Sequence, residues 1–235
     1  MTTSASSVTD PLDVASRRLV RTVDALGEHA WAGASLLPGW TRAHVVAHLA
    51  LNAEGLAGAV VGVLEGRPVT MYPSDEQRDA DIEELASASH AEIRDRLFGA
   101  TTVLRDALGT LATEPSLVET VIHRTPGSDR SFHAGQVGAM RLREVEIHHV
   151  DLDAGYSPAD WPVDFARALV EIGVQRQTVG ATLVATDLGR SWTLGNGPTV
   201  TGPACGLAWW LTGRTPYPGV EVTSDGGKLP GIEGL

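Results

Sequence analysis

A carboxylate and an imidazole lie four residues apart in segment 140–151, whose sequence is MRLREVEIHHVD. Because an α-helix completes a turn in about 3.6 residues, Glu144 and His148 would share one helix face with Val137 and Met140. This stripe begins with apolar residues, so we expect both side chains to point into the protein. A buried carboxylate is unfavourable unless it is paired or bound to a metal ion. The pair therefore predicts part of a metal site.

A second pair of residues with the same spacing lies earlier in the chain. His44 and His48 are four residues apart in a segment rich in valine, alanine and leucine. His48, flanked by Ala47 and Leu49, is expected to be the deeper of the two. Combined with Glu144 and His148, it gives two imidazoles and one carboxylate. Such a set leaves a fourth coordination position open, as in catalytic zinc sites, and facing helices of a bundle can build it.

Other interpretations of these residues remain open. A Glu and a His four residues apart also occur on solvated helix faces, and a single histidine in a core is more often hydrogen-bonded than metal-bound. His44, His149 and Asp151 are rival ligands, and His44 would be the fourth ligand of a closed, structural site. The chain has neither a His-Glu-x-x-His motif nor a glycine-rich phosphate loop.

The chain has one cysteine, Cys205, so it can form neither an internal disulfide nor a cysteine zinc cluster. Cys205 lies in the apolar segment 204–211, where we expect it to be buried as a small hydrophobic residue. Any reactive thiol would then come from another molecule.

Long helices are expected to position the candidate ligands. Asp10 can cap the first of them, with Pro11 at its first position. The predicted helices span residues 11–26, 41–66, 89–111 and 133–152. The polar segment 67–87 is expected to be a long loop, of the kind that often forms a lid or a binding loop, and segment 116–131 is expected to be irregular. These features predict a four-helix bundle over residues 1–155.

The pattern changes near Gly155, after which short β-like runs punctuated by glycines appear. We expect a small α/β domain over residues 156–235, and the whole chain to be of the α+β class. Its helices are predicted at 162–179 and 205–212, and its strands at 181–186, 191–194, 198–201 and 220–223.

Composition limits the possible partners. The 235-residue chain carries a formal net charge of −11, which argues against binding to nucleic acid. The first ten residues are polar and do not resemble a signal peptide, and we expect no run to approach the roughly 20 apolar residues that span a bilayer. We therefore expect a soluble, cytoplasmic monomer that binds small molecules.

Several motifs in combination resemble the mycothiol-dependent maleylpyruvate isomerase family. They extend over nearly the whole chain and are Gly39-Trp40-Thr41-Arg42 before Ala47-His48, Met71-Tyr72-Pro73, Arg143-Glu144-Val145 before Ile147-His148, Val150-Asp151-Leu152, and Gly202, Gly206 and Gly213-Arg214. The family has a DinB-like four-helix bundle, a smaller α/β domain, and a zinc ion held by two His and one Glu. The resemblance implies that His48, Glu144 and His148 are these ligands.

The family's reaction is the cis–trans isomerisation of maleylpyruvate to fumarylpyruvate in gentisate degradation, with mycothiol as cofactor. The resemblance thus implies a low-molecular-weight thiol and a small dianionic substrate. Arg78 and Arg214 match basic positions of the family and are candidates to bind that dianion. Asp151 could hold His148 from behind as a carboxylate partner. His44, Trp40 and Asn52 are expected to line the pocket or belong to the core.

Two other functions fit the same sequence. The nearer one is a mycothiol S-transferase, which conjugates the thiol to another electrophile and does not release it. The farther one is a non-catalytic regulator that uses zinc to stabilise its bundle. A catalytic site needs an open metal position beside a pocket, whereas a structural site would be closed by a fourth protein ligand.

Overall fold

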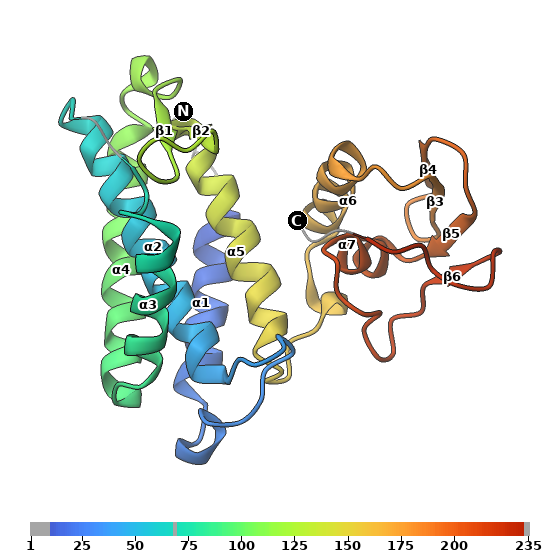
Figure 1. The fold of residues 1–235 in the computed structure, drawn as a ribbon, viewed down its shortest axis with the longest axis horizontal. Coiled ribbons are helices and arrows are strands. Elements are labelled where there is room, and N and C mark those ends of the chain that lie inside the picture. Colours follow the sequence, from blue (N-terminus) through green and yellow to red (C-terminus); the bar gives the residue numbers. More distant parts are fainter. Residues whose placement is uncertain (1–9, 68–69, 233–235) are drawn as a thin grey trace, which may run out of the picture. The chain divides into compact units, whose positions relative to one another are not determined.

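The computed structural model describes residues 10–67 and 70–232, and it divides into two compact units (Figure 1). The first unit ends at Ala154 and is mainly helical, whereas the second begins at Gly155 and contains a four-stranded sheet. The sequence predicted a domain boundary after residue 155, one residue farther along the chain than the boundary between these two units. The α+β class is confirmed. The expectation for the polar N-terminus concerns residues that lie almost entirely outside the described ones.

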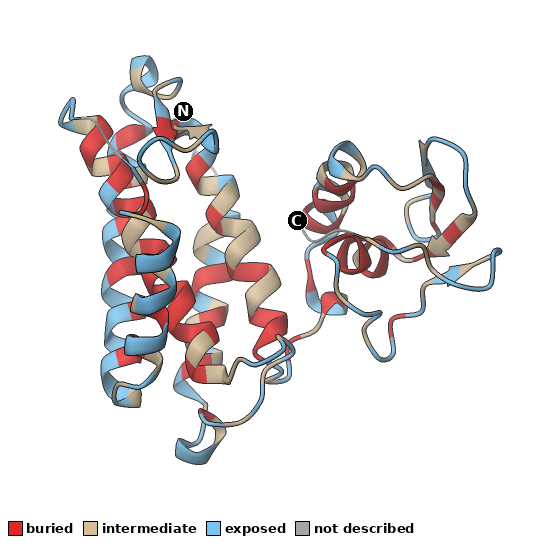
Figure 2. Cartoon of the chain, in the orientation of Figure 1, coloured by how far each residue is buried: buried red, intermediate tan, exposed pale blue. Residues whose placement is uncertain are grey.

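Helices dominate the first unit. Its bundle contains α1 (Pro11–Asp24), α2 (Arg42–Leu64), α4 (His90–Leu111) and α5 (Val137–Asp151). Asp10 caps α1, as expected, because its Oδ1 accepts a hydrogen bond from the Leu12 amide at 2.9 Å. Helix α2 packs against α4 and α5, and α1 packs against α5. Buried residues form stripes along the helices (Figure 2), and two apolar clusters hold the bundle together.

Helix α2 differs from its neighbours in being apolar around most of its circumference. By length and composition it could cross a membrane, but 78% of its most apolar 18-residue stretch is buried inside the protein. A helix that packs on several sides in a soluble core has the same composition. The expectation that no segment approaches membrane-spanning length was therefore wrong for α2, and burial in the bundle explains its composition.

The segment expected to be a loop, 67–87, contains a helix, α3 (Asp75–Ala86), so that expectation was wrong. Ser74 caps this helix by accepting a hydrogen bond from the Gln77 amide at 3.0 Å. Ile82 and Leu85 are its buried residues, which is too few for a clear helical pattern of apolar positions. The helix matters for the site because it carries Arg78.

Segment 116–131, expected to be irregular, contributes to a short hairpin instead. Strands β1 (Val121–His123) and β2 (Ser131–His133) pair antiparallel, with 3-10 turns at Pro115–Leu117 and Ala134–Gln136 on either side. The hairpin holds the loop before α3, because the amides of Met71 and Tyr72 donate to the carbonyls of His123 and Arg124 at 2.9 and 2.8 Å.

The second unit combines helices with a mixed sheet. Its elements are α6 (Val163–Arg176), β3 (Ala181–Ala185), β4 (Arg190–Leu194), β5 (Thr199–Gly202), α7 (Ala204–Leu211) and β6 (Thr223–Ser224). The strand order is β4-β3-β5-β6, in which β3 and β5 are parallel. The last strand begins three residues later than predicted. Cys205, at the start of α7, is half-buried and not fully buried as expected, and burial raises the pKa of its thiol.

Candidate metal centre

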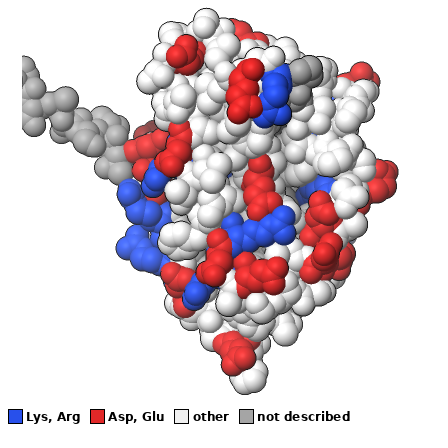
Figure 3. All heavy atoms as spheres, turned by 90° about the vertical axis from the view of Figure 1, so that its left-hand side faces the viewer, with Lys and Arg blue, Asp and Glu red and all other residues white. Residues whose placement is uncertain are grey.

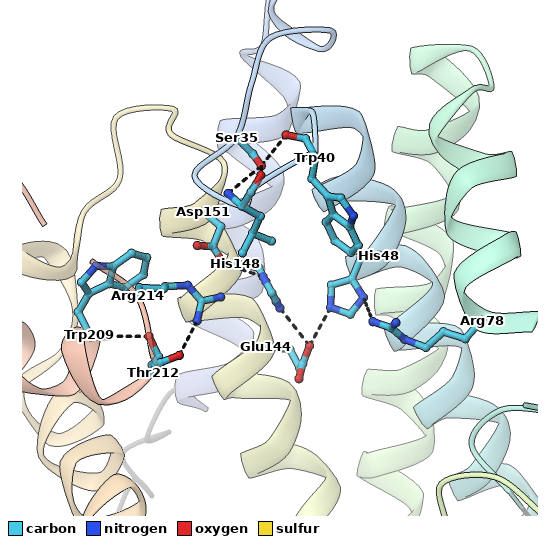
Figure 4. A network of polar contacts seen from close by, with 11 residues as sticks. Ser35, Trp40, His48, Arg78, Glu144, His148, Asp151, Trp209, Thr212 and Arg214 are labelled. Carbon is cyan, nitrogen blue, oxygen red and sulfur yellow. Dashed lines mark hydrogen bonds and ion pairs between the residues drawn. The ribbon is translucent and has the colours of Figure 1, made fainter. Parts of the chain in front are cut away.

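The structure brings three of the predicted site residues together. His48 on α2 and Glu144 and His148 on α5 offer one ligand atom each, and these atoms lie within 4.8 Å of one another. Oε2 of Glu144 is 3.0 Å from Nε2 of His48 and 3.5 Å from Nε2 of His148 (Figure 4). The carboxylate thus lies between the two imidazoles, and each ring turns the same nitrogen toward it.

Hydrogen bonds to backbone carbonyls fix the start of α2 beside the end of α5. This explains why the three side chains meet. Arg42, in the first turn of α2, donates from Nε to the Leu152 carbonyl at 2.7 Å and from Nη2 to the Asp153 carbonyl at 2.8 Å. A cation at the C-terminus of a helix is also favoured by the helix dipole. The Leu36 amide donates to the Asp151 carbonyl at 2.8 Å, which ties the loop before α2 to the same end.

The burial of the cluster is uneven. The side chain of His48 is 6% exposed and that of His148 is 16% exposed, whereas that of Glu144 is 34% exposed. The expectation that Glu144 and His148 both point into the bundle is therefore only partly right. Arg141, Val145 and His149 are among the residues of α5 that the core encloses. The partial exposure of Glu144 leaves the cluster accessible to a small molecule.

Burial and hydrogen bonding set the protonation of the cluster. Burial lowers the pKa of His48 to about 4, so this ring is neutral at physiological pH. Burial alone would raise the pKa of Glu144, but hydrogen bonds to His148 and His48 outweigh it and hold that pKa well below its ordinary value. Burial likewise opposes protonation of His148, but hydrogen bonds to Asp151 and Glu144 raise its pKa. One neutral ring, one carboxylate and one basic ring result.

Each imidazole has a further partner on its other nitrogen. Nδ1 of His148 donates to Oδ2 of Asp151 at 2.8 Å, and this carboxylate is fully buried. Such a carboxylate–histidine contact fixes the orientation of a ligand ring. Nη2 of Arg78 lies 3.2 Å from Nδ1 of His48, so α3 places a guanidinium against the cluster (Figure 4). The Trp40 ring lies 5.8 Å from the His48 ring and covers it.

The rival ligands contact other groups. His44 lies with Nδ1 2.7 Å from Oγ1 of Thr41, where it takes part in capping α2, and with Nε2 3.2 Å from Oε2 of Glu83. His149 is buried with Nε2 2.8 Å from Oγ1 of Thr22. Within residues 10–67 and 70–232, the potential ligand group therefore contains three residues and no fourth protein ligand.

This donor set suits a divalent metal ion. Two imidazole nitrogens and one carboxylate oxygen are ligands that zinc commonly takes, and three protein ligands with one open position are the usual composition of a catalytic zinc site. The neutral state of His48 and the ionised state of Glu144 are the states that bind metal. The residues present thus fit the ion that the sequence suggested.

Arg214 lies in the second unit, between α7 and β6. Its guanidinium carbon lies 5.2 Å from the centre of the Trp209 ring, and Nη1 donates to the Thr212 carbonyl at 3.5 Å. Gly213 before it has a φ of +82°, the left-handed conformation expected of a helix C-cap. A role for Arg214 at the metal cluster stays a prediction.

Two arginines of the first unit were missed in the sequence. Arg141 precedes Glu144 by three residues, is 1% exposed and donates from Nη1 to Oδ1 of Asn52 at 2.7 Å. Its place on the same helical stripe as Glu144 and His148 was the available signal. Arg124 follows β1 and lies 5.2 Å from the centre of the Tyr72 ring. Nothing in its sequence context distinguishes it from a surface arginine.

The first unit matches a known family. The model described as "Mycothiol maleylpyruvate isomerase N-terminal domain" matches residues 12–153. The chain belongs to this family. The match spans α1 to α5, and so includes His48, Glu144 and His148.

Two solved structures resemble this chain over nearly its full length. A crystal structure of the mycothiol-dependent maleylpyruvate isomerase is 25% identical, covers 96% of this chain and 94% of its own, and superposes with a TM-score of 0.85. A histidine-to-alanine variant of that isomerase gives 24% identity, the same coverage and a TM-score of 0.84. A search of curated protein sequences gives no significant match. The fold of both units is therefore that of a mycothiol-dependent enzyme.

Proposed function

We propose that this protein is a mycothiol-dependent isomerase that converts maleylpyruvate to fumarylpyruvate, with one zinc ion held by His48, Glu144 and His148. The observation that carries the proposal is the gathering of these three ligand atoms within 4.8 Å, inside the region that matches the family. The similar crystal structures are of an enzyme with this named activity. We further propose that the protein works as a cytoplasmic monomer in gentisate degradation.

The reaction needs a nucleophilic thiol that can also leave. When bound, zinc would lower the pKa of a coordinated thiol, so that its thiolate is available at neutral pH. His48, neutral because it is buried, and Glu144, ionised because both rings donate to it, are ready to bind the ion. Asp151 keeps the His148 ring oriented through the 2.8 Å contact to Nδ1.

The proposed chemistry balances without any oxidant or reductant. The thiolate sulfur forms a bond to one carbon of the cis double bond, and the π electrons move onto the conjugated carbonyl as an enolate. The former double bond is then a single bond and can rotate. The enolate electrons re-form the double bond, the carbon–sulfur bond breaks, and the thiolate and the trans product are released.

Arg78 is our candidate to bind one carboxylate of the substrate. Its Nη2 faces Nδ1 of His48, which accepts a hydrogen bond only while the ring proton is on Nε2. If Nε2 binds a metal ion, the ring proton moves to Nδ1 and the guanidinium loses this acceptor. Its donors are then available to a carboxylate, for which the planar fork of arginine is suited. Arg214 is our candidate for the second carboxylate.

A turnover experiment tests the proposed function. The zinc-loaded protein is given maleylpyruvate and a small, substoichiometric amount of mycothiol, and products and free thiol are followed by NMR. An isomerase produces many equivalents of fumarylpyruvate while the thiol concentration stays constant. A protein that produces no fumarylpyruvate under these conditions is not this isomerase.

The same experiment identifies the alternatives. A mycothiol S-transferase would consume the thiol one for one with its electrophile and would stop when the thiol is exhausted. A non-catalytic zinc-stabilised bundle would change neither concentration. The absence of a fourth protein ligand from the described ligand group favours the catalytic functions over the structural one.

A further inference from the structure

A buried arginine without a counter-charge lies next to the metal cluster. Arg141 is 1% exposed, and its Nη1 donates to the neutral Oδ1 of Asn52 at 2.7 Å. Its Nε and Nη2 are buried and have no hydrogen-bond partner among the residues that the structure describes. The same described residues include no carboxylate in an ion pair with it. Arg141 thus places a full positive charge in the bundle core, where its only hydrogen-bond partner among the described residues is the neutral amide of Asn52.

The position of this pair relates it to the cluster. Asn52 follows His48 by four residues on α2, and Arg141 precedes Glu144 by three residues on α5. The Asn52–Arg141 contact therefore crosses between the same two helices about one turn away from the His48–Glu144 contact, a rise of about 4.5–6 Å along the helix axes. Burial lowers the pKa of Arg141, and the charge of Glu144 acts in the opposite direction. The Asn52–Arg141 contact thus lies one helical turn from the candidate metal centre.

Stability alone does not account for this arrangement. Removing a guanidinium from water is unfavourable, and buried charges can often be replaced by hydrophobic residues with no loss of stability. Burial lowers the pKa of Arg141 to about 10, which still leaves the group protonated at neutral pH. A trapped water molecule could satisfy a donor, but only a negative charge cancels a positive one. Once Glu144 binds a metal ion, its own charge is taken by that ion.

We propose that Arg141 is a positioning residue whose uncancelled charge, held in place by Asn52, attracts a small dicarboxylate to the face of the His48–Glu144–His148 cluster. The proposal rests on the proposed function for the identity of that ligand. Its field also favours the negative charge that moves onto the substrate when a thiolate adds to it, because electrostatic interactions are strong in a poorly hydrated site. Arg141 is enclosed and acts without touching the ligand.

The choice of residue at position 52 supports this view and supplies the test. An aspartate has the same shape as an asparagine, and Asn52→Asp would turn the 2.7 Å contact into an ion pair that cancels the charge of Arg141. The fold and the zinc ligands would be unaffected. A purely structural Arg141 would be served equally well, or better, by the aspartate.

The experiment measures the affinity of the zinc-loaded protein for maleate, a non-reactive dicarboxylate, by calorimetry, together with the unfolding temperature. We expect Asn52→Asp to keep its zinc and its unfolding temperature but to bind maleate about tenfold more weakly, or worse, since a charge a few ångströms away in protein acts at a low effective dielectric constant. Asn196→Asp, which adds the same charge at an exposed turn of the second unit, should leave the affinity unchanged.

A second pair of variants guards against a folding defect in Asn52→Asp. Arg141→Met removes the charge and should weaken maleate binding to a similar extent, whereas Arg141→Lys keeps the charge and should retain most of the affinity. Equal maleate affinity in the wild type, Asn52→Asp and Arg141→Met would overturn the proposal, as would a wild type that does not bind maleate. If maleate affinity changes as expected but maleylpyruvate is not isomerised, the proposed function fails and the anion-attracting role of Arg141 stands.

Discussion

The candidate metal centre consists of side chains whose protonation is decided by burial and hydrogen bonding. His48 is enclosed and neutral, and Glu144 is kept ionised by the two rings that donate to it. These are the states in which imidazole and carboxylate bind a metal ion, so the site is prepared for one without rearrangement of its charges. His148 differs, because Asp151 makes it more basic and a proton competes for it more strongly.

The first prediction concerns the ligands themselves. We expect purified wild-type protein to contain about one zinc ion per chain. His48→Ala and His148→Ala should each lose most of it, because two ligands bind far more weakly than three. Elemental analysis after gel filtration measures this. His44→Ala is the matched control and should keep its zinc, since His44 contacts Thr41 and Glu83 and not the cluster. Full zinc content in both ligand variants would disprove the assignment.

The second prediction uses the raised pKa of His148. Zinc binding must displace the proton of His148, so affinity should rise with pH until the raised pKa is passed and should fall as the pH drops below it. His48, with a pKa of about 4, stays neutral throughout that range. Asp151→Asn lowers the pKa of His148, so the pH at which affinity begins to fall should move downward.

Chelator competition over a pH series measures both effects of Asp151→Asn. At pH 8, where proton competition is weak, its zinc affinity should be about 10–100-fold lower, because the ring loses the carboxylate that orients it and makes it a stronger ligand. A pH profile that coincides with that of the wild type would show that Asp151 does not control His148.

At the residue scale, the sequence predicted the candidate ligands better than their surroundings. The four-residue spacing of Glu144 and His148, and the apolar segment around His48, were sufficient to nominate the three residues that the structure brings together. Their depth was misjudged, because the stripe of α5 that carries Glu144 lies at the edge of the core. The burial of Arg141 was missed because a charged residue in a helix is normally solvated, although its place on the stripe of Glu144 and His148 was a signal.

The elements around the site are positioned by close backbone contact at one glycine of α2. A Cβ on Gly55 would lie 2.9 Å from the Met71 carbonyl oxygen and 3.1 Å from Cε1 of Tyr72. The loop that leads into α3, and thereby to Arg78, packs against this helix at that point. Glycine is a poor helix former, but at position 55 of α2 it allows the loop to pack close to the helix.

This contact gives a prediction with an internal control. Gly58→Ala, in the same helix with open space around it, should stabilise the protein by about 0.5–1 kcal/mol through helix propensity alone. Gly55→Ala gains the same propensity but must displace Met71 and Tyr72, so we expect a net destabilisation of about 1–3 kcal/mol. It should also lower kcat/KM, because Arg78 moves with the loop. Urea unfolding of both variants measures the difference, and equal stabilisation would disprove the packing argument.

At the element scale, strong apolar periodicity separated what could be predicted from what could not. The long helices α1, α2, α4 and α5 are rich in buried apolar residues and were found within a few residues of their true ends. Helix α3 buries Ile82 and Leu85 and depends on its Ser74 cap and its packing on α2, so its polar sequence suggested a loop. The three-residue strands of the hairpin are too short for any alternating pattern to be visible.

At the scale of the whole molecule, the surface agrees with a protein that binds small molecules. The chain has a net charge of −11, and both acidic and basic side chains lie among uncharged ones on the face shown in Figure 3. Substrate attraction must therefore come from local charges, because the net charge repels a dianion. Within the first unit, Arg78 and Arg141 are the cations next to the cluster that could provide it.

The second unit holds none of the three candidate metal ligands, so its part in catalysis depends on whether one of its side chains reaches the substrate. Arg214 is the residue that the family resemblance nominates. Its guanidinium lies over the Trp209 ring, and Arg190 makes a similar contact 5.1 Å from the centre of the Trp192 ring, together with an ion pair to Glu171 at 2.8 Å. Arg190→Ala is therefore a matched control for the loss of an arginine stacked on tryptophan.

The last prediction is that Arg214→Ala keeps its zinc and its fold but loses most of its kcat/KM for maleylpyruvate. The planar fork of arginine can bind a carboxylate through two hydrogen bonds, and losing a charge-assisted contact of this kind costs about 1.5–3 kcal/mol, or about 10–150-fold in rate constant. Steady-state kinetics with saturating mycothiol, alongside elemental analysis and thermal unfolding, separates this loss from misfolding. Arg190→Ala should retain wild-type kinetics. If Arg214→Ala isomerises maleylpyruvate as fast as the wild type, Arg214 is an ordinary surface residue and the second carboxylate is bound elsewhere.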